Sequence, residues 1–493
     1  VANTQSKLTS IFLGKNRQMA KRQAVKPVEE VMDSEETSST IVEEMMDDEF
    51  AFGSGSEGEE EILPFERKAA LRIAQQVAEA DGAEKELATA VSADEEGRYD
   101  FTMDMGSDLE AVHQRFLKIV HTLQVFKDRR ALHLKRTDYL SQLALDLSVY
   151  YGYSEWHISM LLELFPPVEL IDYLEANEKP RPLVLRANGL KTKRGELARS
   201  LIARGVDLDP VGDWTREGLH VYKSQVPLGA TPEYLLGHYL IQDAASFLPV
   251  LALGAKPGER VLDMAAAPGG KTTHIGQFMK NEGTLLANDV NEDRIPSLLA
   301  NIQRLGICNC VVTNYDGRNL TKIIGATLDR VLLDAPCTGL GTVSRDPTAK
   351  VSKDGTDVLR MAHLQKELAL AAIDMLKVGG SLVYSTCSIT VPENEAIVDY
   401  LLKYRHVKIQ PLPEAIQFGR PGLVNFRGKR FDASIKHARR VYPHTHNMLG
   451  FFVCLLVKTE PGVKGKRPDG SGPPKATVPK MKRKPRPMPN KRI

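Results

Sequence analysis

The sequence predicts an α/β protein built around a doubly wound, mostly parallel sheet, preceded by a helical segment and a small α+β module and flanked by two polar tails. Two observations predict the sheet. Between residues 231 and 458, short continuous apolar runs alternate with helical patterns, as in strands buried on both faces of a parallel sheet. A turn of small residues with paired glycines, Gly269 and Gly270, then joins one such run to a helical pattern.

The charges separate toward the two ends of the chain. Residues 29–61 hold 14 acidic residues and no Lys or Arg, so residues 1–105 are predicted to be a mostly disordered acidic tail. Residues 461–493 hold 11 Lys or Arg, one acid and eight prolines, which predicts a basic Pro/Lys-rich tail over 459–493. The basic run at 480–486 is interpreted as a nuclear-import signal, a phosphate-contacting segment or a solubilising end.

The cysteines and the hydropathy pattern indicate the compartment. The five cysteines lack C-x-x-C pairs, which argues against a disulfide framework and against a metal site. No run of 18 apolar residues and no apolar signal-peptide core is present, so we expect neither a membrane-spanning nor a secreted protein. A reducing compartment follows, in which free thiols are available for chemistry.

Two smaller units are predicted before the sheet. Ser107, Asp108 and Glu110 fit a capping box, and apolar residues recur at helical spacing from Leu109, so a helical segment is predicted over 106–180. Residues 181–230 mix short apolar runs with one amphipathic helix near 196–203, which predicts a small α+β module. A solvated loop and an RNA-phosphate surface explain its basic cluster equally well: Arg181, Arg186, Lys191, Lys193 and Arg194.

Acidic residues follow three successive strands of the domain predicted over 231–458. Strands are expected at 261–262, 284–287, 311–312, 330–333 and 381–384, and Asp289, Asp316 and Asp334 follow the second, third and fourth. Open α/β sheets bind ligands at the carboxyl ends of their strands, so acids beside a Gly-Gly turn favour an adenosine site, with Asp289 taking the ribose hydroxyls. The turn matches neither G-x-G-x-x-G nor a P-loop.

Two cysteines follow adjacent strands at the same edge. Cys337 lies three residues after Asp334, and Cys387 follows the strand at 381–384. Carbon 5 of cytosine is a poor nucleophile, and a thiolate that adds at carbon 6 activates it for methyl transfer. This attack needs a proton or hydrogen bond at ring nitrogen 3, for which Asp334 is the candidate acid. The pair therefore predicts methylation of cytosine carbon 5.

These motifs resemble the Nol/Nop/Sun family of RNA 5-methylcytosine methyltransferases over roughly residues 110–455. The resemblance rests on residues 263–272, 334–337, 385–388 and 392–395, and on 442–452 in the form typical of the nucleolar branch that acts on large-subunit ribosomal RNA. It implies a Rossmann-like methyltransferase domain, an RNA-binding role for 181–230, pre-ribosomal particles as partners and a nucleolar location. Leu449 and Val391 depart from the pattern, in which acidic residues are expected at both places.

The resemblance also implies roles for individual residues. Cys387 matches the nucleophile, and Cys337 matches the cysteine that helps to release the enzyme from its methylated product. The cofactor S-adenosylmethionine is implied, with a binding site formed by Ala265, Ala266, Ala267, Pro268, Gly269, Gly270, Lys271, Asp289, Asp316 and Asp334.

Three alternatives stay open. The first is an assembly factor that mainly binds pre-ribosomal RNA, with methylation secondary. The second is a nicotinamide-dependent oxidoreductase on the same sheet architecture, which the missing G-x-G-x-x-G disfavours. The third is the same chemistry on transfer RNA or DNA, because pocket shape and flanking contacts, which no motif reports, select the modified base.

Overall fold

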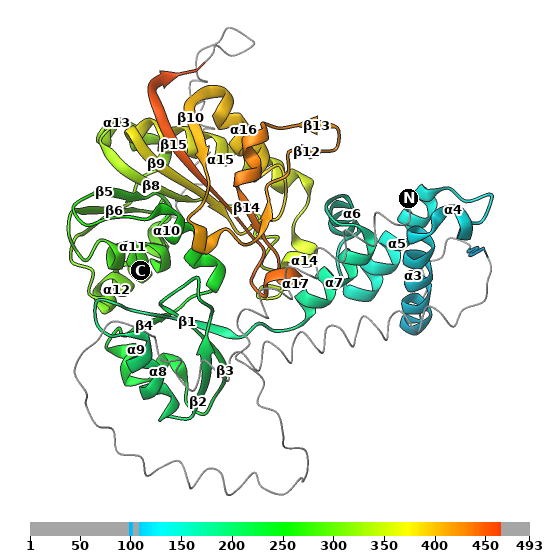
Figure 1. Cartoon of the computed structure of the whole chain (residues 1–493), viewed down its shortest axis with the longest axis horizontal. Helices are drawn as coiled ribbons and strands as arrows, with labels where there is room; N and C mark the ends of the chain where they lie inside the picture. The colour runs from blue at the N-terminus through cyan, green and yellow to red at the C-terminus, as the bar shows by residue number, and fades with distance from the viewer. Residues whose placement is uncertain (1–97, 102–107, 465–493) are drawn as a thin grey trace, which may run out of the picture. The chain divides into compact units, whose positions relative to one another are not determined.

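The computed structural model describes residues 98–101 and 108–464 (Figure 1). The predicted acidic tail lies outside the described residues except at 98–101, and the predicted basic tail lies outside them beyond residue 464. Within these residues no helix is both long and apolar enough to cross a membrane.

Helices form the first part of the described chain. They are α3 (Leu109–Gln124), α4 (Phe126–Arg129), α5 (Arg136–Tyr151), α6 (Glu155–Leu164) and α7 (Pro167–Glu178). The N-cap of α3 is Asp108, whose carboxylate accepts a hydrogen bond from the backbone N–H of Glu110 at 3.1 Å. Apolar residues of these helices, such as Phe116 and Leu147, share one buried cluster with Leu340 and Tyr442 from the later part of the chain. The helical segment therefore packs directly on the later α/β domain, to which Leu340 and Tyr442 belong.

A small antiparallel sheet comes next, with the strand order β2-β3-β1-β4. Its elements are β1 (Leu183–Ala187), α8 (Arg194–Ile202), β2 (Val206–Pro210), β3 (Gly218–Ser224), α9 (Pro232–Leu235) and β4 (Tyr239–Ile241). The sequence assigned residues from 231 onward to the next domain, but β4 pairs with β1, with Leu240 opposite Arg186. Three residues are too short a run to reveal their sheet by pattern, which is why β4 was missed.

The large sheet has nine strands, in the order β11-β14-β15-β9-β8-β5-β6-β7, with β10 also paired to β15. Five neighbours are parallel, namely β5 (Arg260–Asp263), β6 (Thr284–Asn288), β7 (Cys310–Thr313), β8 (Leu328–Asp334) and β9 (Leu376–Thr386). The others are antiparallel: β10 (Arg405–Gln410), β11 (Arg420–Pro421), β14 (Arg439–Val441) and β15 (Phe451–Val463). The predicted doubly wound, mostly parallel α/β class is confirmed for the core of this sheet. β15 continues through residue 463, beyond the tail boundary predicted at 459.

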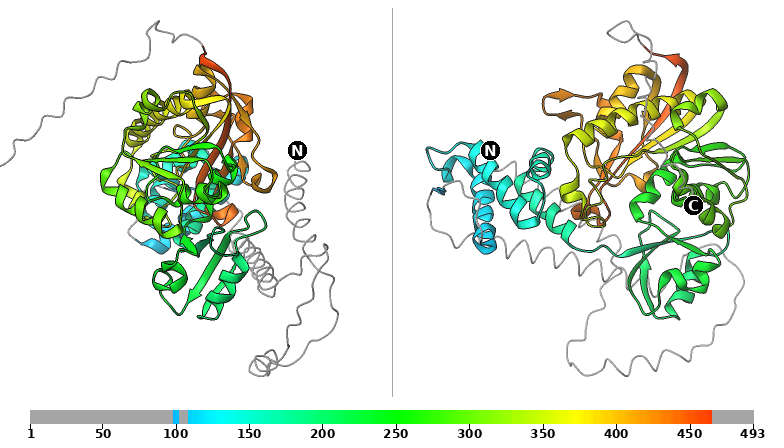
Figure 2. Two further views of the ribbon diagram at one scale, coloured as in Figure 1. Left: turned by 90° about the vertical axis from the view of Figure 1, so that its left-hand side faces the viewer. Right: turned by 180° about the vertical axis from the view of Figure 1, so that it is seen from behind.

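Helices cover both faces of this sheet (Figure 2). On one face pack α13 (Thr321–Ile324), α15 (Gly355–Met375) and α16 (Glu395–Tyr404), and on the other α10 (Leu248–Leu253), α11 (Gly270–Phe278) and α12 (Ile295–Leu305). Side chains alternate accordingly, since Leu262 and Leu382 belong to one buried cluster while Val261 and Val383 belong to the other. Short elements complete the domain: α14 (Ala349–Ser352), the β12 (Asn425–Phe426) and β13 (Lys429–Arg430) hairpin, and α17 (Pro443–His446).

Candidate active site

The small-residue turn joins β5 to α11 as the sequence predicts. Gly269 has a φ of 99°, in the left-handed region that favours glycine, and α11 begins at Gly270. The Asp289 carboxylate, at the end of β6, accepts a hydrogen bond from the backbone N–H of Ala267 at 3.0 Å. The Thr272 hydroxyl donates to Asp263 Oδ2 at 2.7 Å, whereas Asp263 Oδ1 is buried without a partner. The turn therefore has a fixed backbone and an unused buried acceptor beside it.

The three predicted acids lie at the carboxyl ends of three parallel strands, β6, β7 and β8, with β5 between β6 and β8. Asp289 follows β6 and is almost fully buried, at 3 % exposure. Asp316 follows β7, caps the next short helix and forms an ion pair with Arg318 at 2.6 Å. Asp334 is the last residue of β8. The structure thus brings these acids to the edge of the sheet that carries the Gly-Gly turn.

Asp334 is paired with a lysine from the turn. Lys271 Nζ lies 2.7 Å from Asp334 Oδ2, and the Ser385 hydroxyl donates to Asp334 Oδ1 at 2.8 Å. Burial acts to lower the pKa of Lys271, but the Asp334 carboxylate outweighs burial and raises it. Lys271 is therefore held as an ammonium beside the candidate acid, a contact that the sequence did not predict.

The two cysteines meet. Cys337 Sγ lies 3.2 Å from Cys387 Sγ, because β8 and β9 are parallel neighbours with Asp334 opposite Ser385. The hydrogen bond from Cys337 lowers the pKa of the Cys387 thiol, and Lys271 lowers it further, while burial and the nearby carboxylates oppose both. The same hydrogen bond, together with burial, raises the pKa of Cys337 well above its ordinary value. Cys387 is therefore the better thiolate, and Cys337 holds its proton.

One buried carboxylate, which the sequence did not single out as a site residue, ties the two cysteine loops together. Glu393 is fully buried and accepts from the backbone N–H and hydroxyl of Thr338 at 2.9 and 2.6 Å. It also accepts from the Ser388 hydroxyl at 2.5 Å and from Thr390 at 2.9 Å. Thr338 and Ser388 are the residues directly after the two cysteines. In the sequence, Glu393 appeared only as a member of the run 392–395 that was matched to the family.

One residue of the basic cluster in the small module, Arg186, fits neither sequence interpretation. Arg186 is 1 % exposed, and its guanidinium donates to the Gly270 carbonyl, to Gln242 and to the Thr273 hydroxyl. Lys191 Nζ donates to two backbone carbonyls at 2.8 Å. Arg186 is therefore neither a solvated loop residue nor part of a free phosphate-binding surface, whereas Lys191 is exposed and bound to the backbone. Arg186 thus holds the start of α11, directly next to the Gly-Gly turn.

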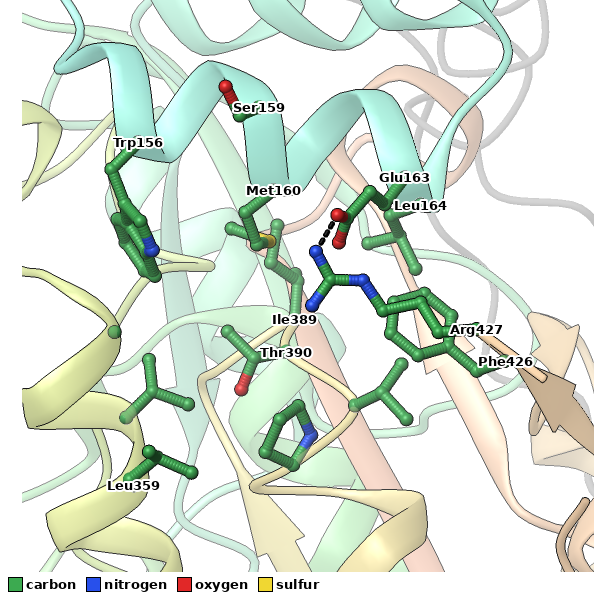
Figure 3. Close-up of a pocket in the computed structure, with 14 residues that line it drawn as sticks. Trp156, Ser159, Met160, Glu163, Leu164, Leu359, Ile389, Thr390, Phe426 and Arg427 are labelled. Atoms are coloured by element: carbon green, nitrogen blue, oxygen red, sulfur yellow. Dashed lines mark ion pairs between the residues drawn. The ribbon is translucent and has the colours of Figure 1, made fainter. Parts of the chain in front are cut away.

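A cavity of about 250 Å³ is lined in part by residues 389–392, which follow Cys387 in the chain (Figure 3). Trp156 and Met160 of α6, Leu359 of α15, and Ile389 and Thr390 line it. Thr390 is also a donor to Glu393, so the wall of this cavity is part of the network that holds the cysteines.

The two positions that depart from the family pattern are buried: Val391 is 3 % exposed and Leu449 is 6 % exposed. Apolar side chains at these two positions avoid the cost of burying a carboxylate.

The fold and the site together define a class. A Rossmann-like sheet with a Gly-Gly turn, acids at successive strand ends and two thiols beside them is a methyltransferase of the cysteine-dependent kind. In the described part of the chain, no three His, Cys, Asp or Glu side chains gather as a metal site.

Comparison with known proteins places the chain within that class. The family described as 16S rRNA methyltransferase RsmB/F matches residues 250–457. A solved structure described as a methyltransferase homolog protein from Pyrococcus horikoshii is 36% identical, with a TM-score of 0.58 over 64% of this chain and 98% of that one. The chain belongs to the RsmB/F methyltransferase family.

Eukaryotic relatives are more similar in sequence. The mouse 28S rRNA (cytosine-C(5))-methyltransferase is 53% identical over 71% of this chain and 44% of its own length. The 25S rRNA (cytosine-C(5))-methyltransferase nop2 of Schizosaccharomyces pombe is 49% identical over 71% of this chain and 58% of its own length. The chain thus spans about half the length of these curated relatives. The resemblance predicted from the motifs is confirmed.

Proposed function

We propose that the protein methylates carbon 5 of a cytosine in large-subunit ribosomal RNA of the 25S/28S type, with Cys387 as the covalent nucleophile. The observation that carries the proposal is the 3.2 Å contact between Cys337 and Cys387, next to the cofactor turn. The names of the mouse and fission-yeast relatives support the substrate and the modified atom. Family membership disfavours the oxidoreductase alternative.

The residues present fit S-adenosylmethionine. A positively charged methionine ammonium needs buried acceptors, and Asp263 Oδ1 is a buried acceptor without a partner at the end of β5. We propose the predicted set for the cofactor site: the turn from Ala265 to Lys271 with Asp289, Asp316 and Asp334. A more distant neighbour, NSun6 from Pyrococcus horikoshii, was solved with SFG, an S-adenosylmethionine analogue. S-adenosylmethionine supplies the methyl group when bound.

The side chains then have separate roles. The Cys387 thiolate adds to carbon 6 of the cytosine and makes carbon 5 nucleophilic. A proton must reach ring nitrogen 3 as the thiolate adds; Asp334 passes it on from the Lys271 ammonium at 2.7 Å. After methyl transfer, a base takes the carbon 5 proton, the electron pair of that bond forms the carbon 5–carbon 6 double bond, and the Cys387 thiolate leaves while ring nitrogen 3 returns its proton to Asp334. Cys337 assists this release. Glu393 keeps both cysteine loops in place throughout.

The test is an RNA–protein adduct that survives denaturation. We expect Cys337→Ala, incubated with RNA and S-adenosylmethionine, to accumulate the adduct, because attack proceeds and release fails. We expect none with Cys387→Ala. The opposite pattern would assign the attack to Cys337.

A related proposal concerns place and partners. We propose a nuclear, nucleolar location and association with pre-ribosomal particles, which the names of the 28S and 25S rRNA relatives support. The assembly-factor alternative makes a distinct prediction. If RNA binding is the main role, Cys387→Ala restores ribosome production in depleted cells while the methyl mark is lost.

A further inference from the structure

The helical segment separates its charges along the chain. Residues 139–178 contain seven acidic residues and no Lys or Arg, whereas residues 127–136 contain five Lys or Arg and one acid. We call these five cations the basic end: Lys127, Arg129, Arg130, Lys135 and Arg136.

The acidic half is used for contacts with the sheet domain. Glu178 pairs with Lys350 at 2.6 Å, and Glu169 contacts Arg420 and, at 3.0 Å, His444. Glu163 of α6 pairs with Arg427 of the β12–β13 hairpin (Figure 3). Each of these carboxylates has a cationic partner from the later part of the chain, so this half of the segment is the docking face.

Within residues 98–101 and 108–464, the basic end makes no corresponding contact. Among the residues that the structure describes, none of its five cations forms an ion pair with a carboxylate. Lys127, Lys135 and Arg136 are exposed. The nearby Asp138 caps its own helix by accepting from the Lys135 backbone N–H at 2.8 Å, and Asp100 faces His133 at 3.2 Å. Surface cations without carboxylate partners attract polyanions.

Two arginines of the basic end lie over an aromatic ring. The guanidinium carbons of Arg130 and Arg136 lie 5.6 and 5.7 Å from the centroid of the Phe126 ring. Arg129 is held by a 3.0 Å contact with His121. Contacts of this kind restrict the long side chains before a ligand arrives, so less side-chain entropy is lost on binding. An ordered group of arginines suits the phosphate and sugar backbone of a nucleic acid.

We propose that the basic end is a second RNA-binding surface, which contacts the backbone of the substrate RNA away from the cytosine being modified. The inference rests on the proposed function only in taking RNA as the partner. The surface lies on α4, the segment 130–135 and the first residue of α5, whereas the thiols lie after β8 and β9. It supplies affinity and register, while the target base is selected elsewhere.

The test measures RNA binding by the full chain. The variant combines Lys127→Gln, Lys135→Gln and Arg136→Gln, and the probe is a fluorescein-labelled large-subunit ribosomal RNA transcript. We expect affinity at low salt to fall by about tenfold and the slope of log affinity against log salt to decrease by about two, since each of the three lost phosphate contacts contributes roughly 0.7 on single-stranded RNA. A second variant with Lys127→Gln and Lys135→Gln keeps Arg136 on the Phe126 ring and should show a smaller effect of the same kind.

The control removes the same charge elsewhere, with Lys322→Gln, Lys408→Gln and Lys436→Gln, which are all exposed. Equal losses in this control and in the basic-end variants would overturn the proposal, because binding would then follow net charge alone. A gain in RNA affinity in the basic-end variants would also overturn it and would point to the acidic residues 29–61 as the partner. If the wild-type chain binds RNA through the basic end but transfers no methyl group, the proposed function fails and this inference stands.

Discussion

Cys337 Sγ and Cys387 Sγ lie 3.2 Å apart, and this hydrogen bond acts in opposite directions on the pKa values of the two thiols. The pair therefore makes Cys387 the more acidic of the two thiols before any substrate is bound. The two cysteines follow the carboxyl ends of the neighbouring parallel strands β8 and β9, so the sheet itself brings the two thiols into contact.

The first prediction concerns the nucleophile. Cys337→Ala removes the donor, so the pKa of Cys387 rises and its alkylation by iodoacetamide at neutral pH becomes slower. The rate should be measured against pH by mass spectrometry of the Cys387 peptide, and its midpoint should move to higher pH. Cys337→Ser keeps a hydroxyl donor and should stay closer to the wild type. An unchanged midpoint in the alanine variant would show that the thiol contact does not set the reactivity.

The second prediction concerns Glu393. In Glu393→Gln, an amide group replaces one of the two carboxylate oxygens, which together accept from five hydroxyl and N–H donors, so at least one buried donor loses its partner. We expect a loss of about 2 kcal/mol in the free energy of unfolding, measured by urea titration, and a larger proportional loss of adduct formation. Glu414→Gln is the control, because Glu414 is exposed. Full adduct formation in a destabilised Glu393→Gln protein would limit Glu393 to a structural role.

The third prediction concerns Arg186. Arg186→Met leaves the Gly270 carbonyl and the Thr273 hydroxyl without their donor, so the start of α11 loosens. We expect S-adenosylmethionine binding to weaken by about tenfold, measured by calorimetry, with little change in RNA affinity. Lys193→Met, in the same sequence cluster but exposed, should leave cofactor binding unchanged. If RNA affinity falls and cofactor binding does not, Arg186 contacts RNA phosphate rather than holding the start of α11.

The fourth prediction concerns Asp263. Burial raises its pKa to about 7, the nearby Asp334 carboxylate adds to this, and Thr272 and Lys271 oppose it. Since the folded-state pKa lies above the unfolded one, the contribution to stability is full below about pH 4 and is lost as the pH rises through 7. Asp263→Asn should therefore flatten this part of the stability curve in urea unfolding between pH 5 and 8. Identical slopes for the two proteins would contradict the assignment.

Much of the fold could be predicted because its signals are local. The apolar runs, the Gly-Gly turn and the residues after each strand are properties of neighbouring positions. Helix starts are also set by local contacts: α15 begins at Gly355 because Asp354 caps it by accepting from the N–H groups of Thr356 and Asp357.

By itself, the sequence determined the α/β class and the order in which acids and cysteines follow the parallel strands. Since parallel strands share one carboxyl edge, that order was enough to bring Cys337 and Cys387 together. Only the tertiary structure decided which thiol keeps its proton, that Glu393 joins their loops, and that Arg186 is buried against Gly270, 84 positions away. Charge pattern reports how many cations a segment has, but burial and partners depend on long-range packing, which no local pattern contains.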